Sequence, residues 1–135
     1  MIWKFNTSDF TLSYLHNLNI SGAVFHDMID ALYVWNNGAQ LFVGSSNGLV
    51  KAYLFDNSTG QYIVNGMTPN LGDYIYAVWV SASGNKMLVA VRGGCKALDY
   101  ISSSWSINTP SFLSTLGPNH FIYLMPTSDR QRIII

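Results

Sequence analysis

The feature that most constrains this chain is an internal repeat with an offset of 46 residues. The segment 29–43, IDALYVWNNGAQLFV, aligns without a gap on 75–89, IYAVWVSASGNKMLV. Both copies begin with isoleucine, carry glycine at the tenth position and end with valine. A further step of the same length reaches 121–135, FIYLMPTSDRQRIII, where Arg130 takes the place of the glycine. Such a chain is expected to fold as a series of like units.

The similarity continues downstream of these segments. The stretch 48–56, GLVKAYLFD, matches 93–100, GGCKALDY, with Lys51 over Lys96, after one residue is lost in the preceding turn. The N-terminal stretch 2–6, IWKFN, matches the end of the same unit. The repeat therefore covers nearly the whole chain.

Each copy has the pattern of short strands separated by turns. The pairs Asn37-Gly38 and Asn47-Gly48 are typical hairpin turns, and apolar, β-branched and aromatic residues fill the segments between them. In the clearer copy the predicted strands a, b, c and d are 30–35, 40–44, 49–55 and 61–64.

Four antiparallel strands in a period of roughly 40 to 50 residues are the arrangement of a β-propeller blade. A twisted four-stranded sheet cannot bury both faces alone, so it packs face to face against copies of itself. We therefore predict an all-β fold with about three blades' worth of strands, in the order c-d, a-b-c-d, a-b-c-d, a-b. The whole chain, 1–135, is predicted to be part of one propeller domain: the end of one blade (1–22), two blades (23–68 and 69–116) and the start of the next (117–135).

Three blades are too few to close a ring, because propellers typically have about four to eight. Open ends would leave apolar edge strands unpaired, which natural proteins avoid. We expect the remaining blades to come from a longer polypeptide. The alternative is that neighbouring chains complete the ring, with one chain's a-b pair meeting another's c-d pair.

Two segments carry a family resemblance. The stretch 44–56, GSSNGLVKAYLFD, resembles the end of a WD-type repeat, and 78–91, VWVSASGNKMLVAV, resembles the a–b hairpin of that family and of the related YVTN-type propellers. The resemblance implies a propeller fold and a role in protein–protein contacts. No copy holds the full Trp-Asp dipeptide, and Asn47 stands at the turn position where the family has Asp. The hydrogen-bonded tetrad of WD repeats is therefore expected to be missing.

The composition agrees with a β-rich chain without a strong electric field. Aromatic residues make up 14%, and none of the seven acidic residues is Glu, a strong helix former. Charged residues make up 10%, against about a quarter in an average protein. Seven Lys and Arg balance the acids, so no net charge attracts nucleic acid or an anionic membrane. Either many strands are buried, or neighbours in an assembly cover the surface.

Other features indicate little about location. Cys95 is the only cysteine and falls in a predicted strand, where a buried, inert thiol is expected. No apolar run approaches the roughly 20 residues of a membrane span, and the start of the chain does not resemble a signal peptide, which slightly favours the cytoplasm. N-glycosylation sequons occur at Asn6, Asn19 and Asn57, but about two are expected by chance in so polar a set of turns.

Candidate binding residues follow from the predicted topology. Loops joining d to a and b to c lie at one end of a propeller, so polar residues in these loops are expected to cluster there. The set consists of His26, Asp27, Asn47, Asp73, Tyr74, Arg92 and His120. Trp105 is added as an exposed aromatic anchor, because it lies in the Ser-rich, linker-like segment 102–111.

The sequence predicts no catalytic, cofactor-binding or metal-binding residues. His26, Asp27 and Asp30 lie close together, but a polar loop explains them better than a metal or acid–base site. The stretch 44–48, GSSNG, has no following Lys-Ser/Thr, as a phosphate loop would, and no Gly-x-Ser-x-Gly motif occurs.

We therefore expect a non-catalytic propeller scaffold that binds other protein subunits within a larger assembly, without cofactors. The alternatives are a secreted or surface glycoprotein propeller and, less favoured, a propeller enzyme of the lactonase or quinoprotein type. Histidines and carboxylates that recur at equivalent positions of several blades would support the enzyme, and the sequence has none.

Overall fold

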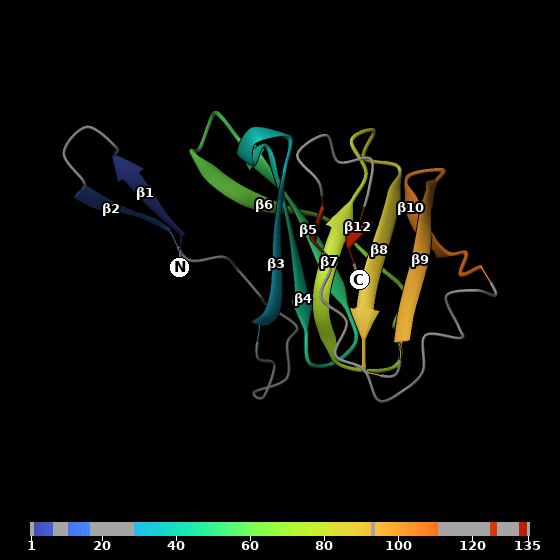
Figure 1. The fold of residues 1–135 in the computed structure, drawn as a ribbon. Helices are drawn as coiled ribbons and strands as arrows, with labels where there is room; N and C mark the ends of the chain where they lie inside the picture. The colour runs from blue at the N-terminus through green and yellow to red at the C-terminus, as the bar shows by residue number, and fades with distance from the viewer. Residues whose placement is uncertain are drawn as a thin grey trace.

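The computed structural model of the chain describes residues 2–6, 11–16, 29–92, 94–110, 125–126 and 133–134. Its centre is formed by two antiparallel four-stranded sheets that pack face to face (Figure 1). This arrangement confirms the predicted all-β fold of propeller-like blades.

The first sheet has the strand order β3-β4-β5-β6 and the second has the order β7-β8-β9-β10. Two separate hairpins are β1 (Ile2–Asn6) with β2 (Thr11–His16), and β11 (Met125–Pro126) with β12 (Ile133–Ile134). The strands of the two sheets are β3 (Ile29–Trp35), β4 (Gln40–Ser45), β5 (Val50–Asp56), β6 (Gln61–Met67), β7 (Ile75–Val80), β8 (Lys86–Val91), β9 (Gly94–Ile101) and β10 (Ser104–Ile107).

Strand register repeats with the same offset as the sequence. The pair Trp79 and Leu88, which joins β7 to β8, recurs 46 residues later as Met125 and Ile134, which join β11 to β12. The β3–β4 and β7–β8 ladders also shift register at the same place, after Ile29 in one and after the equivalent residue in the other. The internal repeat is therefore a repeat of hydrogen-bonding pattern as well as of residue type.

The predicted hairpin turn at Asn37-Gly38 joins β3 to β4 and is a 3-10 turn, η1 (Asn36–Gly38), in which Asn36 and Asn37 both have positive φ. The Ala39 N–H donates to the Asn36 carbonyl at 3.0 Å. One local prediction needs correction, because the segment 102–111 is not a linker throughout but contains β10. The proposed blade boundaries stay a prediction.

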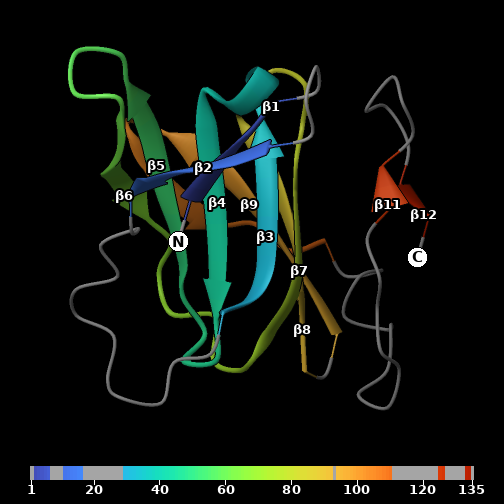
Figure 2. The ribbon, with the colours of Figure 1, turned by 90° about the vertical axis from the view of Figure 1, so that its left-hand side faces the viewer.

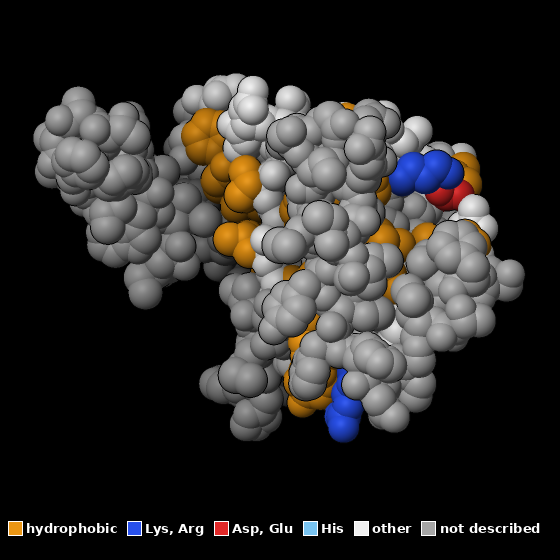
Figure 3. Space-filling model, in the orientation of Figure 1, with side chains coloured by type: hydrophobic (Ala, Val, Ile, Leu, Met, Phe, Trp, Pro, Cys, Tyr) orange, Lys and Arg blue, Asp and Glu red, His pale blue; other side chains and the backbone are white. Residues whose placement is uncertain are grey.

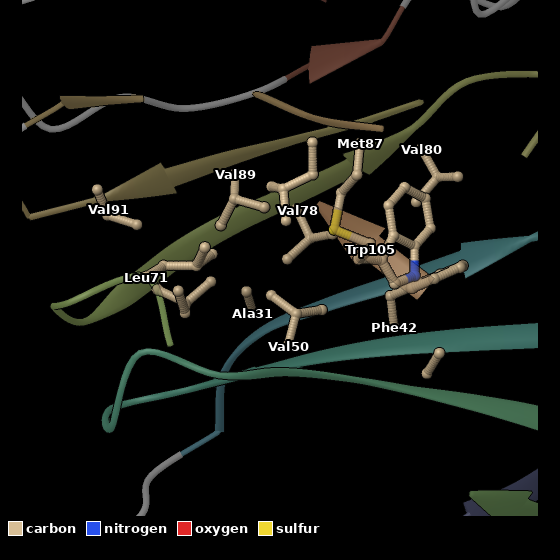
Figure 4. Packing of buried hydrophobic residues seen from close by; sticks show 13 residues of the cluster. Ala31, Phe42, Val50, Leu71, Val78, Val80, Met87, Val89, Val91 and Trp105 are labelled. Atoms are coloured by element: carbon tan, nitrogen blue, oxygen red, sulfur yellow. The ribbon is translucent and has the colours of Figure 1, made fainter. Parts of the chain in front are cut away.

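Figure 2 shows the first sheet stacked in front of the second, and the main core fills the space between them (Figure 4). Each of its large aliphatic side chains stabilises the fold by about 1.5–3 kcal/mol relative to exposure to water. Ile75, Val80 and Val89 of the second sheet are entirely buried, and Val50 of the first is 1% exposed. The cluster comprises Ala31, Phe42, Val50, Ala52, Leu71, Ile75, Val78, Val80, Met87, Val89, Val91, Leu98 and Trp105.

The innermost strands of the two sheets approach each other closely. A β-carbon at Gly44 of β4 would lie 2.8 Å from the Ile75 β-carbon, so only glycine fits beneath Ile75. Two side chains of β3 also cross to the neighbouring blade. The Tyr33 hydroxyl donates to the Val80 carbonyl at 3.2 Å, and the Trp35 indole N–H donates to the Ser81 carbonyl at 2.8 Å.

The opposite face of the first sheet is apolar as well. Leu41, Val43 and Tyr53 are buried there. Side chains on the same face, Leu32, Val34, Val64 and Met67, are each about half exposed or more. Figure 3 shows hydrophobic side chains at the edge of the molecule on this side. An apolar outer face of this kind is typical of a propeller blade that packs against a further blade on that face.

Candidate functional site

The candidate site lies where the β4–β5 turn meets the β6–β7 loop. Gly48, in the β4–β5 turn, has a φ of +80°, and a β-carbon there would lie 2.8 Å from Asn70 Oδ1 and 3.1 Å from the Asp73 backbone. The Leu71 N–H donates to the Gly48 carbonyl at 2.8 Å. The Ser45 hydroxyl donates to Asn47 Oδ1, which orders the same turn. Asn47 and Asp73 are therefore held at the same end of the molecule.

A second contact links this pair to the next blade. The Arg92 N–H, in the β8–β9 turn, donates to the Tyr74 carbonyl at 3.1 Å. The Tyr74 N–H in turn donates to Asp73 Oδ1 at 2.8 Å. The Arg92 side chain is exposed, and the Tyr74 side chain is 41% exposed. We call the surface formed by Asn47, Gly48, Asp73, Tyr74 and Arg92 the loop end.

The loop end brings together four of the eight candidate residues named from the sequence: Asn47, Asp73, Tyr74 and Arg92. Whether they bind a partner stays a prediction. His26, Asp27 and His120 lie outside the described residues.

Trp105 is the candidate that the structure contradicts. It is 7% exposed and lies in β10, where its ring packs edge-on against Phe42 of the first sheet at a centroid distance of 6.2 Å. Trp105 therefore belongs to the core between the sheets and is not an exposed anchor.

A groove between the two sheets opens at the other end of the molecule, near η1 and the β7–β8 turn, with a volume of about 210 Å³. Its walls include Phe42, Tyr100 and Trp105. The sequence analysis missed this groove, because residues far apart in the chain form it only when the sheets stack. Phe42, Tyr100 and Trp105 lie in three different strands, so no local pattern in the sequence marks the groove.

Few charged interactions occur among the described residues. Residues 29–92 and 94–110 contain no group of three His, Cys, Asp or Glu side chains placed to hold a metal ion. Hydrogen bonds from Ser58 and Thr59 hold the pKa of exposed Asp56 below its usual value. Hydrogen bonds from Lys86 and Asn108 do the same for Asp99, whose carboxylate is 2.6 Å from the Lys86 ammonium.

Cys95 is buried, as predicted, and burial raises the pKa of its thiol to about 11. It is therefore protonated at neutral pH and poorly nucleophilic. The part of the chain that the structure describes also contains no helix with the length and apolar character of a membrane span.

Comparison with known proteins supports the fold. No protein-family model matches the sequence, and no curated protein matches it significantly. Among solved structures, the chain is similar to the periplasmic gluconolactonase PpgL of Pseudomonas aeruginosa, with 17% identity and a TM-score of 0.55 over 78% of this chain and 33% of that one. The fold is β-propeller-like.

A second solved structure is Sqt1 of Saccharomyces cerevisiae, with 13% identity and a TM-score of 0.49 over 60% of this chain and 22% of that one. A likeness at this level does not bear on the function of the chain. The chain spans about a third of the length of the gluconolactonase and about a fifth of the length of Sqt1. The β-propeller-like fold by itself does not determine a function, because propellers carry many.

Proposed function

We propose that this chain is part of a non-catalytic β-propeller that binds other protein subunits through its loop end. The observation that carries the proposal is the juxtaposition of exposed Tyr74 and Arg92, which come from different loops and are joined through the Tyr74 carbonyl. Tyr and Arg are enriched among the residues that dominate protein–protein binding energy. The absence of net charge further favours a partner recognised by shape and local contacts.

The backbone of the loop end is held rigidly while its side chains reach solvent. Gly48 of the β4–β5 turn packs under Asp73, and the Arg92 N–H of the β8–β9 turn donates to the Tyr74 carbonyl. Both turns therefore contact the β6–β7 loop, which contains Asp73 and Tyr74. A rigid surface loses less conformational entropy on binding than a mobile one. This preorganisation supports a binding role for the loop end.

The test is to introduce Tyr74→Ala and Arg92→Ala separately into the full-length protein in its native host. Stably associated proteins are then quantified by affinity isolation and mass spectrometry. Each substitution is expected to remove the same specific set of proteins. Lys86→Ala is the matched control, since it removes an exposed cation at the other end. If the associated proteins are the same in all variants, the loop end is not the binding surface.

A secreted or surface glycoprotein is the second candidate. The observation that favours it is Asn57, one of the three sequon asparagines, which lies exposed in the β5–β6 turn. Peptide mapping of the protein from its native source checks this directly. A glycan mass on the Asn57 peptide would favour this candidate, and an unmodified Asn57 peptide would count against it.

A further inference from the structure

The groove between the two sheets has a different chemistry from the loop end. The ring centroids of Tyr100 and Trp105 are 5.0 Å apart, with their planes tilted by 50°, and Phe42 meets Trp105 edge-on. Figure 4 shows Phe42 and Trp105 facing each other across the two sheets. Tyr100 is 42% exposed, so its ring forms the accessible part of this aromatic wall. The groove therefore offers an apolar surface to a ligand from solvent.

Amide side chains surround the aromatic wall. Gln40, Asn65 and Asn85 line the groove. The Gln40 and Asn65 side chains have no hydrogen-bond partner within residues 29–92 and 94–110, and Asn85 Oδ1 accepts from the Ser83 hydroxyl, which leaves its amide nitrogen as a donor. The groove thus presents hydrogen-bond donors beside aromatic rings.

A break in the β-ladder places one of these amides. Ala52 pairs with Gly66, whereas the next residue, Tyr53, pairs with Val64, so Asn65 is the extra residue of a β-bulge. A bulge redirects a side chain and is over-represented next to functional sites. The bulge leaves both Asn65 and Gly66 opposite Ala52, which also lines the groove.

None of the described residues that line the groove is charged. An anionic or cationic ligand would lose its hydration there without gaining an opposite charge, so the groove suits an uncharged ligand. Its volume of about 210 Å³ is below the roughly 300–1,000 Å³ of most small-molecule pockets. It is therefore matched to one or two side chains of a longer ligand that continues outside the groove.

We infer that the groove binds an uncharged, proline-containing extended segment of a partner protein. Such a segment in the polyproline II conformation has apolar rings and backbone carbonyls without internal hydrogen bonds. Aromatic-lined grooves recognise these segments because the segments lose little conformational entropy on binding. Here the exposed ring of Tyr100, which Trp105 supports from the core, contacts the proline rings, and Gln40, Asn65 and Asn85 donate to the carbonyls.

This inference takes only the class of partner from the proposed function, because the groove and the loop end share no residue. Loss of associated proteins on Tyr74→Ala or Arg92→Ala reports on the loop end. Direct binding of a peptide reports on the groove. The two hypotheses can therefore fail separately.

The experiment titrates the full chain with an end-blocked octaproline peptide and, in parallel, with an end-blocked Gly-Ser repeat of equal length and a neutral cello-oligosaccharide. Binding is measured by calorimetry. Octaproline is expected to bind saturably, with an affinity that does not depend on salt, and the Gly-Ser peptide is not. Tyr100→Ala is expected to weaken octaproline binding about tenfold.

Asn65→Ala is the second test variant, since its exposed side chain can be truncated without disturbing the core, and it is expected to weaken octaproline binding too. Ile101→Ala is the matched control, because Ile101 is the exposed neighbour of Tyr100 on β9 and points to the opposite face of the sheet. Absence of saturable octaproline binding, or equal affinity in Tyr100→Ala and wild type, would overturn the inference. Binding of the oligosaccharide alone, lost in Tyr100→Ala, would also overturn it and would assign the groove to a glycan.

Discussion

The two blades place different residues at equivalent positions of the same backbone pattern. Gly44 in β4 lies directly beneath Ile75 of the next blade. The position 46 residues later is Ala90, which is completely buried beside Cys95 and has Ala77 opposite it in the ladder. The strand pairing around Gly44 and Ala90 is the same. The two positions hold different residues because the neighbouring side chains leave a different amount of room at each. The repeat determines the backbone hydrogen bonding within each sheet, whereas the side chains that pack on each face differ from blade to blade.

A second pair of equivalent positions shows the same principle for polar groups. Tyr33 donates its hydroxyl to the Val80 carbonyl of the next blade. Trp79, 46 residues later, has a buried indole N–H with no acceptor among the described residues. A buried donor without a partner costs about 1–3 kcal/mol. At this position the side-chain donor is hydrogen-bonded at the interface between the two described blades, whereas the equivalent donor on the outer face of the second blade is not.

The largest expected effect is that of Ile75→Ala, which removes the side chain that lies over Gly44. Ile75 has no exposed surface, so the substitution loses buried area and leaves a cavity. The free energy of unfolding is expected to fall by about 2–5 kcal/mol. Urea unfolding followed by tryptophan fluorescence measures it. A change below about 1 kcal/mol would mean that the two blades are not packed as described.

Gly44→Ala would make the first blade resemble the second at this position. Its methyl group would collide with Ile75, and the free energy of unfolding is expected to fall by about 1–3 kcal/mol. In the double variant with Ile75→Ala the clash with the Ile75 Cγ2 atom is removed, and of the contacts with position 75 only that between the two β-carbons, at 2.8 Å, remains. The collision is therefore partly relieved, and the two single-variant losses of stability are expected to sum to more than the loss in the double variant. Strict additivity in the same unfolding assay would show that Gly44 and Ile75 do not meet.

Trp35→Phe and Trp79→Phe compare a bonded indole with an unbonded one. Both substitutions remove a similar aromatic area, but only the first breaks a hydrogen bond, from Trp35 to the Ser81 carbonyl. Because Trp79→Phe also removes an unpaired buried donor, Trp35→Phe is expected to cost at least about 1 kcal/mol more in the free energy of unfolding than Trp79→Phe. Equal costs would indicate that the Trp79 N–H also has an acceptor.

The effect that is smallest at neutral pH concerns Cys95, which pairs with Ala90 in the β8–β9 ladder. Its thiol has a pKa of about 11 in the folded chain against 9.0 when unfolded, because burial disfavours the thiolate. Below pH 9 both states keep the proton, so stability is unaffected. As the pH rises from 9 toward about 11, the unfolded state ionises first and stability falls, by at most about 1.4 kcal/mol per pH unit. The difference between wild type and Cys95→Ala across this range isolates the thiol from the tyrosines, and parallel pH profiles would contradict the burial.

The sequence predicted the strands and turns of the first blade to within a few residues, and it predicted that Asn47, Asp73, Tyr74 and Arg92 share one end. The first prediction rests on local signals, namely apolar alternation and Asn-Gly turns, and the second on the strand order of a propeller blade that the repeat implies. It predicted a fourth strand for the second blade but treated 102–111 as linker-like, although this segment contains that strand, β10, whose residues, SWSI, carry little β-pattern and whose hydrogen-bonded neighbour is β9. An edge strand of this kind forms because the adjacent strand and the core hold it in place.

The sequence by itself determined the repeated unit, its period and the register that follows from it, because the spacing of turns and apolar residues acts over short distances along the chain. Only the tertiary structure decided which residues of each unit are buried. Trp105 is buried because Phe42 of the other sheet lies against it, and Gly44 is required because Ile75 of the next blade lies over it. Burial depends on what the facing sheet supplies, and a pattern within one strand does not contain that information.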